Sequence, residues 1–80
     1  MLHEAVVALH AGRPAALLQQ QAVQAGVTLQ PMFADARDDD GRRWWLLLSA
    51  DAPRLAALIS RLQNEADVEA AYLKPAGRAP

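Results

Sequence analysis

Four short segments of this chain have the apolar content or the apolar–polar alternation typical of β-strands. The four segments are residues 4–10, 27–30, 44–48 and 68–73. The first is closed by a breaker that contains Gly12 and Pro14, and the second alternates strictly between apolar and polar positions. Because a proline cannot donate to a central ladder, Pro31 at the end of the second segment indicates an edge strand. The pattern therefore predicts four strands, the second of them at a sheet edge.

Two longer segments have the spacing of amphipathic helices. Pro14 suits the first turn of a helix and Gly26 suits its end, so we expect the first helix over residues 14–25. Asp51 can cap the second helix, in which an early Pro53 is tolerated. The apolar faces of the two helices consist of Ala15, Leu18, Ala22 and Ala25 in the first and of Leu55, Leu58, Ile59 and Leu62 in the second.

The order strand, helix, strand, strand, helix, strand is that of the ferredoxin-like α+β fold. This βαββαβ pattern forms a four-stranded antiparallel sheet with two helices on one face, and the first and third strands are central. The polar segment 34–43 is predicted to be a long hairpin loop between the second and third strands. Residues 1–73 are thus expected to form a single domain, and residues 74–80, which include two prolines, an extended C-terminal tail.

The third strand is apolar on both faces, because it reads Trp44-Trp45-Leu46-Leu47-Leu48. Side chains alternate along a strand, so one tryptophan is expected in the core and the other on the face that the helices leave open. Alternation along the other strands places Ala70 and Tyr72 on the covered face. It places a further set on the open face: Val6, Ala8, Met32, Ala71 and Leu73. A contiguous apolar surface of this kind marks an interaction site.

Composition and charge narrow the classes of function. The chain of 80 residues has a formal net charge of -1, whereas a general nucleic-acid binder normally carries a basic patch. It has no cysteine, which excludes disulfides and thiolate metal sites. No run approaches the roughly 20 apolar residues of a membrane span, and the first residues lack the features of a signal peptide. As given, the chain is expected in the cytoplasm and off the membrane, unless it is excised from a longer precursor.

No arrangement of residues typical of catalysis is found, so we expect that the protein is not an enzyme. His3 and His10 are predicted to point to opposite faces of one strand and so cannot share a metal. Asp38, Asp39 and Asp40 lack the alternating spacing and distal glutamate of a calcium loop, and they are interpreted as a solvated loop. Neither a cofactor nor a metal is expected.

The end of the chain carries a pattern known from one family. The last predicted strand follows an amphipathic helix and reads Val68-Glu69-Ala70-Ala71-Tyr72-Leu73-Lys74-Pro75. This segment resembles the end of the propeptide and inhibitor domains that accompany subtilisin-like serine proteases. In those domains a helix and a short break are followed by a Val-Glu-x-x-Tyr/Val strand that runs into an extended tail. The order of elements agrees over nearly the whole chain.

The resemblance implies a domain that packs the open face of its sheet against two surface helices of the protease and lays its tail along the active-site cleft. The implied partner is a subtilisin-like serine protease, in cis or in trans, and the implied role is that of an inhibitor or a folding chaperone. The partner-binding residues that it implies by position are Met32, Trp44, Trp45, Leu47, Tyr72, Leu73, Lys74, Pro75, Ala76, Gly77, Arg78, Ala79 and Pro80.

Two alternatives remain open. Residues 25–29, Ala-Gly-Val-Thr-Leu, also suit an amino-acid-sensing regulatory domain of ferredoxin-like fold, which would bind its ligand near the loop at residues 11–14. The other alternative is an adaptor that docks or forms a homodimer through its sheet and has no protease partner.

Overall fold

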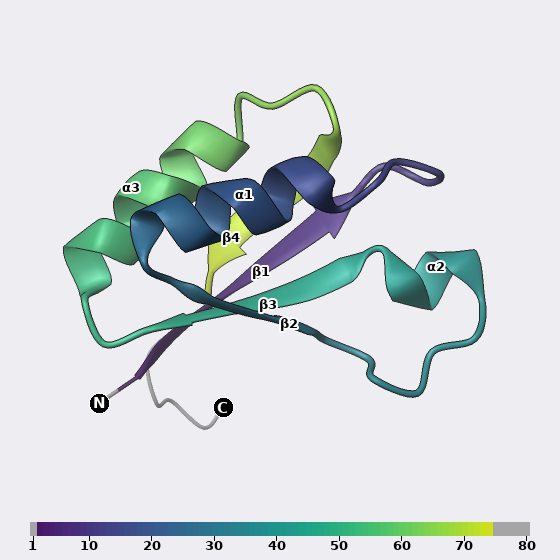
Figure 1. The fold of residues 1–80 in the computed structure, drawn as a ribbon, viewed down its shortest axis with the longest axis horizontal. Helices are drawn as coiled ribbons and strands as arrows, with labels where there is room; N and C mark the ends of the chain where they lie inside the picture. The colour runs from purple at the N-terminus through teal and green to yellow at the C-terminus, as the bar shows by residue number, and fades with distance from the viewer. Residues whose placement is uncertain (1, 75–80) are drawn as a thin grey trace.

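The computed structural model describes residues 2–74 and confirms the ferredoxin-like α+β fold. The elements in chain order are β1 (His3–Leu9), α1 (Ala16–Ala25), β2 (Thr28–Pro31), α2 (Asp39–Arg42), β3 (Trp44–Ser49), α3 (Ala52–Leu62) and β4 (Val68–Leu73). The strands form one antiparallel sheet in the order β2-β3-β1-β4, so β1 and β3 are central as predicted. Helices α1 and α3 lie side by side on one face of this sheet (Figure 1).

The two long helices begin and end at residues with a clear local role. Asp51 caps α3, since its Oδ1 accepts a hydrogen bond from the Arg54 amide at 3.1 Å. Gly26 ends α1 in the left-handed conformation, with φ of 70°, which glycine adopts without strain. Arg54 also donates from Nη1 to the carbonyl of Ala25 at 3.2 Å, which joins the start of α3 to the end of α1. Helix α1 begins at Ala16, so Pro14 precedes it instead of lying in its first turn.

The segment 34–43, predicted as a long loop, contains the one-turn helix α2. Asp38 precedes this helix, and its Oδ1 accepts a hydrogen bond from the amide of Gly41 at 2.9 Å. The prediction of two helices was therefore incomplete, because a single capped turn leaves no apolar periodicity in the sequence.

The core lies between the two long helices and the face of the sheet that they cover. Ala5 and Val7 of the central strand β1 and Leu47 of β3 are fully buried there. The helices contribute the apolar faces predicted for them, and Leu55, Leu58 and Leu62 of α3 are almost entirely buried. The partly buried Trp45 packs against the edge of this core.

A β-bulge at Glu69 reverses the predicted alternation along β4. Ala8 pairs with Ala70, but Leu9 pairs with Val68, so Glu69 is an extra residue in the ladder. Beyond the bulge, Ala71 and Leu73 lie on the covered face opposite Val7 and Ala5, and Ala70 and Tyr72 lie on the open face. The assignment of these residues from simple alternation was therefore wrong, because one unpaired residue shifts every later side chain to the other face.

The predicted edge position of β2 is confirmed, and the register shows why Pro31 is tolerated there. The amide of Met32 donates to the carbonyl of Trp44 at 3.1 Å, so Met32 belongs to a hydrogen-bonded pair of the β2–β3 ladder. Hydrogen-bonded and non-hydrogen-bonded pairs alternate, so the backbone nitrogen of Pro31 points away from β3. The missing N–H therefore removes no bond of the sheet.

The last described residue, Lys74, still belongs to the sheet. It was predicted to begin the tail, but its amide donates to the carbonyl of Glu4 at 2.9 Å, so the β1–β4 ladder continues one residue beyond Leu73. The rest of the predicted tail, residues 75–80, lies outside the described residues.

Replacement of the cap residue, Asp51→Ala, should lower the free energy of unfolding by about 1 kcal/mol, because the Arg54 amide loses its acceptor. Urea denaturation followed by circular dichroism measures this change. Asp35→Ala, at an exposed position outside the helices, is the matched control and should leave stability unaltered. Equal losses in the two variants would contradict the capping role.

Candidate protein-binding surface

The face of the sheet opposite α1 and α3 presents three cross-strand rows of side chains, which we call the open face. The registers define these rows as Gln30-Leu46-Val6-Tyr72, Trp44-Ala8-Ala70 and Thr28-Leu48-Glu4. Apolar side chains thus fill the middle of the face on β3, β1 and β4. Polar side chains of β2, and Glu4 at the start of β1, lie around them.

Burial on the open face decreases outward from the central strand. Val6 and Ala8 of β1 are buried, with exposed fractions of 1% and 0%. Trp44 and Leu46 of β3 are partly buried, and Tyr72 on the edge strand β4 is 48% exposed. The surface available to a partner is therefore formed mainly by the larger side chains of β3 and by Tyr72. These side chains project beyond the smaller, buried side chains of β1.

One end of the open face is bordered by an ion pair between the two chain-end strands. Lys74 Nζ lies 3.1 Å from Glu4 Oε1, and both side chains are partly exposed. Thr28 and Gln30 are exposed along β2. An apolar centre inside a polar rim is the usual composition of a protein interface.

The other end is fixed by Arg43, the residue directly before β3. Its Nη1 donates to Glu69 Oε2 at 2.9 Å and to the carbonyl of Leu9 at 3.2 Å, and its Nε donates to Asp40 Oδ1 at 3.1 Å. The guanidinium also lies over the ring of Trp44, 5.2 Å from its centroid. Arg43 thus joins α2, β1 and the bulge of β4, and it orients the partly buried Trp44 of the open face.

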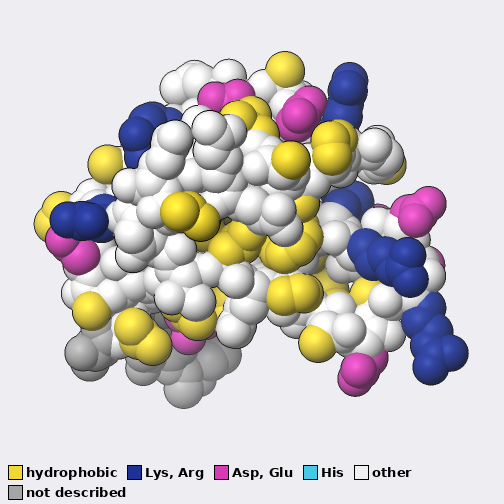
Figure 2. All heavy atoms as spheres, in the orientation of Figure 1, with side chains coloured by type: hydrophobic (Ala, Val, Ile, Leu, Met, Phe, Trp, Pro, Cys, Tyr) yellow, Lys and Arg dark blue, Asp and Glu magenta, His cyan; other side chains and the backbone are white. Residues whose placement is uncertain are grey.

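The electrostatic surroundings of Arg43 favour its charged form. The hydrogen bond to Glu69, and after it the one to Asp40, raise the pKa of Arg43 above its ordinary value. Figure 2 shows basic and acidic side chains mixed over α2 and the neighbouring loops, at the right of the view. Sequence reasoning missed Arg43, because Leu9 and Glu69 are 34 and 26 residues away and the local sequence indicates only a polar loop.

The structure places some of the predicted partner-binding residues on the open face and others on the side covered by the helices. Trp44 and Tyr72 lie on the open face, and Met32 is adjacent to Trp44 through its backbone hydrogen bond. Leu47 has an exposed fraction of 0%, so its assignment to a docking surface was wrong: it pairs with Ala5 beneath the helices.

Trp45 and Leu73 also lie on the covered side. Trp45 packs against the core, and its buried Nε1 has no hydrogen-bond partner among residues 2–74. Trp44 is therefore the tryptophan that faces outward. Leu73 lies at the border of the covered face and is 46% exposed. The remaining predicted residues, Pro75 to Pro80, are outside the described part of the chain.

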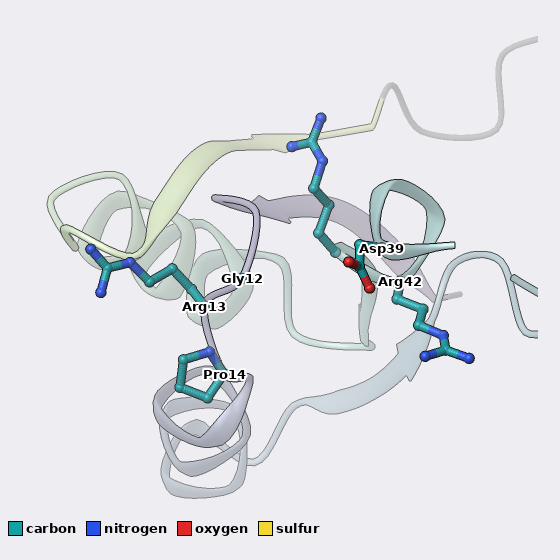
Figure 3. Close-up of a pocket in the computed structure, with 6 residues that line it drawn as sticks. Gly12, Arg13, Pro14, Asp39 and Arg42 are labelled. Carbon is teal, nitrogen blue, oxygen red and sulfur yellow. The ribbon is translucent and has the colours of Figure 1, made fainter. Parts of the chain in front are cut away.

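A cleft of about 300 Å³ lies between the β1–α1 loop and α2. It is lined by Gly12, Arg13, Pro14, Asp39, Arg42 and Arg43. Figure 3 shows Arg13 and Arg42 directed away from each other, to opposite sides of the cleft. A small-molecule site needs a few polar groups that converge on the ligand, so this cleft by itself gives the amino-acid-sensing alternative little support.

In residues 2–74, no group of three or more His, Asp or Glu side chains is placed to hold a metal ion. None of the helices in this part of the chain is long and apolar enough to cross a membrane.

Comparison of the sequence with protein-family models and with curated proteins finds no match. The similarity to subtilisin propeptides therefore remains a prediction from the C-terminal motif.

The two tryptophans should differ in their contribution to stability. Trp45→Ala opens a cavity beside the core and should lower the free energy of unfolding by about 3 kcal/mol, whereas Trp44→Ala should cost less than half as much. Urea denaturation of the two variants, each against the parent chain, makes the comparison. A larger loss for Trp44→Ala would contradict the assignment of faces.

Proposed function

We propose that this domain is a protein-binding module that docks its open face on a subtilisin-like serine protease and directs its C-terminal segment into the active-site cleft. The observation that carries the proposal is that a single strand, β4, serves both parts. It presents Tyr72 on the open face, and it continues directly into Lys74 and the residues that follow.

The open face supports docking on a protein surface. Trp44 and Tyr72 flank the buried centre at Ala8 and Val6, and large aromatic side chains of this kind contribute most of the binding energy in many interfaces. Arg43 restrains Trp44 before any partner binds, which lowers the entropy lost on association. The polar rim formed by Glu4, Lys74 and Gln30 suits the border of such an interface.

The end of β4 supports delivery of the C-terminal segment. Glu4 holds Lys74 twice, by its carbonyl oxygen to the amide at 2.9 Å and by its carboxylate to Nζ at 3.1 Å. Lys74, the last described residue, is therefore fixed at a defined point on the border of the open face. Pro75 follows in the sequence and favours an extended conformation at Lys74. An extended segment can add as a strand to the substrate groove of an enzyme.

Docking of the open face and binding of the C-terminal segment strengthen each other, because the domain and the segment belong to one chain. When the sheet is docked, the segment after Lys74 is held near the cleft at a high effective concentration, and weak binding of each part becomes strong binding of the whole. The same arrangement suits an inhibitor that acts in trans and a propeptide that assists folding in cis.

Peptide hydrolysis by a subtilisin-like protease, ideally one encoded beside this chain, tests the proposal. The intact chain should slow hydrolysis, and removal of residues 75–80 should weaken inhibition roughly 100-fold, because the linked second contact is lost. Trp44→Glu should weaken it about 30-fold, since a charge is then placed in the desolvated centre of the interface.

Val23→Glu is the matched control, because Val23 is 79% exposed and lies on α1, on the opposite side of the sheet. It should inhibit as the parent chain does. Failure of the intact chain to inhibit or to form a complex with the protease would reject the proposal. A complex that removal of residues 75–80 leaves equally strong would reject the role proposed for the C-terminal segment and leave docking through the open face alone.

A further inference from the structure

The sheet has two edges, and each is a place where a second chain could add a strand. Strands β2 and β4 are the outer members of the order β2-β3-β1-β4. An edge strand presents backbone N–H and C=O groups that are not used by its own sheet, and these invite pairing with another copy. Whether these groups are free to pair determines whether copies of the chain can associate through their sheets, independently of any protease partner.

The register shows which groups of β4 point outward. Lys74 donates its amide to the carbonyl of Glu4, so these two residues form a hydrogen-bonded pair. Such pairs alternate with pairs whose backbone groups point away from the partner strand. The backbone groups of Ala71 and Leu73, which pair with Val7 and Ala5, therefore point away from β1, toward the free edge.

Gln63 occupies the central acceptor of this edge. It is the C-cap residue of α3, and its side-chain Nε2 donates to the carbonyl of Ala71 at 2.8 Å. The position of this bond agrees with the outward direction that the register gives. An incoming strand would need the same carbonyl for its own ladder, and it would also meet the Gln63 side chain at the edge.

The other edge is treated in a different way. Leu29 and Pro31 are the residues of β2 whose backbone groups point away from β3, because Met32 is in a hydrogen-bonded pair. Pro31 has no N–H to offer at this outward position. An added strand would therefore find one donor fewer on a strand of only four residues.

We propose that Gln63 and Pro31 close the two edges of the sheet to strand addition by a second copy of this chain. Gln63 acts by occupying an acceptor, and Pro31 acts by lacking a donor. The open face then remains the surface through which the domain binds other proteins, and the β-sheet does not extend from one copy to the next.

Replacement of Gln63 by a side chain without a donor tests the closure of β4. In Gln63→Ala and in Gln63→Met, the carbonyl of Ala71 becomes available. In a two-fold β4–β4 pairing, the Ala71 carbonyl of each copy accepts one hydrogen bond from the other copy. A gain of two hydrogen bonds should lower the concentration at which dimers form by about 30-fold. Analytical ultracentrifugation over a concentration series measures this shift, and circular dichroism verifies that each variant is folded.

Two variants serve as controls for the effect of the donor. Gln63→Lys keeps a donor and adds a charge at the edge, so it should remain monomeric at the concentrations at which the parent chain does. Gln24→Ala removes an exposed glutamine from α1 and should have no effect. Pro31→Thr restores an N–H on β2 and should promote association through the other edge.

Two outcomes would overturn the proposal. One is that folded Gln63→Ala, Gln63→Met and Pro31→Thr associate no more than the parent chain. The other is that Trp44→Glu, introduced into Gln63→Ala, abolishes its dimer, because the contact would then lie on the open face and not at the edge. Persistence of the dimer in that double variant supports pairing at β4.

Discussion

The packing of α1 and α3 on a single face of the sheet is the constraint on which the other features depend. Leu55, Leu58 and Leu62 of α3 are buried against the same side that holds Ala5 and Leu47. Within residues 2–74, both long helices lie on that side, and neither covers the second side. The central strands are nevertheless apolar on both faces, so the open face must rely on its own larger side chains to shield Val6 and Ala8.

Arg43 attaches the segment between β2 and β3 to the sheet. This segment is long and polar, so it has few apolar side chains of its own to pack there. Arg43 connects it to the end of β1 and to the bulge of β4 by hydrogen bonds, and the same side chain lies over Trp44. Order in the loop and orientation of the Trp44 ring are therefore coupled through one residue.

The sequence was sufficient for the fold because its elements have strong periodicity and clear boundary residues. Asp51, Gly26 and Pro31 each have the local role expected of them. The sequence was insufficient where the outcome depends on pairing between strands. Nothing near Glu69 indicates a bulge, and the bulge decides that Tyr72, and not Ala71, reaches the open face.

The candidate surface was predicted only in part for the same reason. Alternation correctly required Trp44 and Trp45 to lie on opposite sides, but it could not say which one faces the helices. The register of β3 against β1 settles this, because Trp45 pairs with Val7 of the core beneath the helices, whereas Trp44 pairs with Ala8 on the open face. Leu47 follows Trp45 onto the covered side. The ion pair between Glu4 and Lys74 joins residues at the two ends of the domain, so no pattern in the sequence around either residue indicates it.

The antiparallel pairing of β1 with β4 also determines how the domain responds to mechanical force. The start of β1 and the end of β4 lie at the same end of the sheet, because Glu4 pairs with Lys74. A pull on the two strand ends therefore loads the hydrogen bonds of this ladder one after another, as in the opening of a zipper, instead of shearing them together. The first bonds of this ladder to break are those between Glu4 and Lys74. The antiparallel pairing of the two end strands would therefore resist a pull on both strand ends less than the same bonds would if they were sheared together.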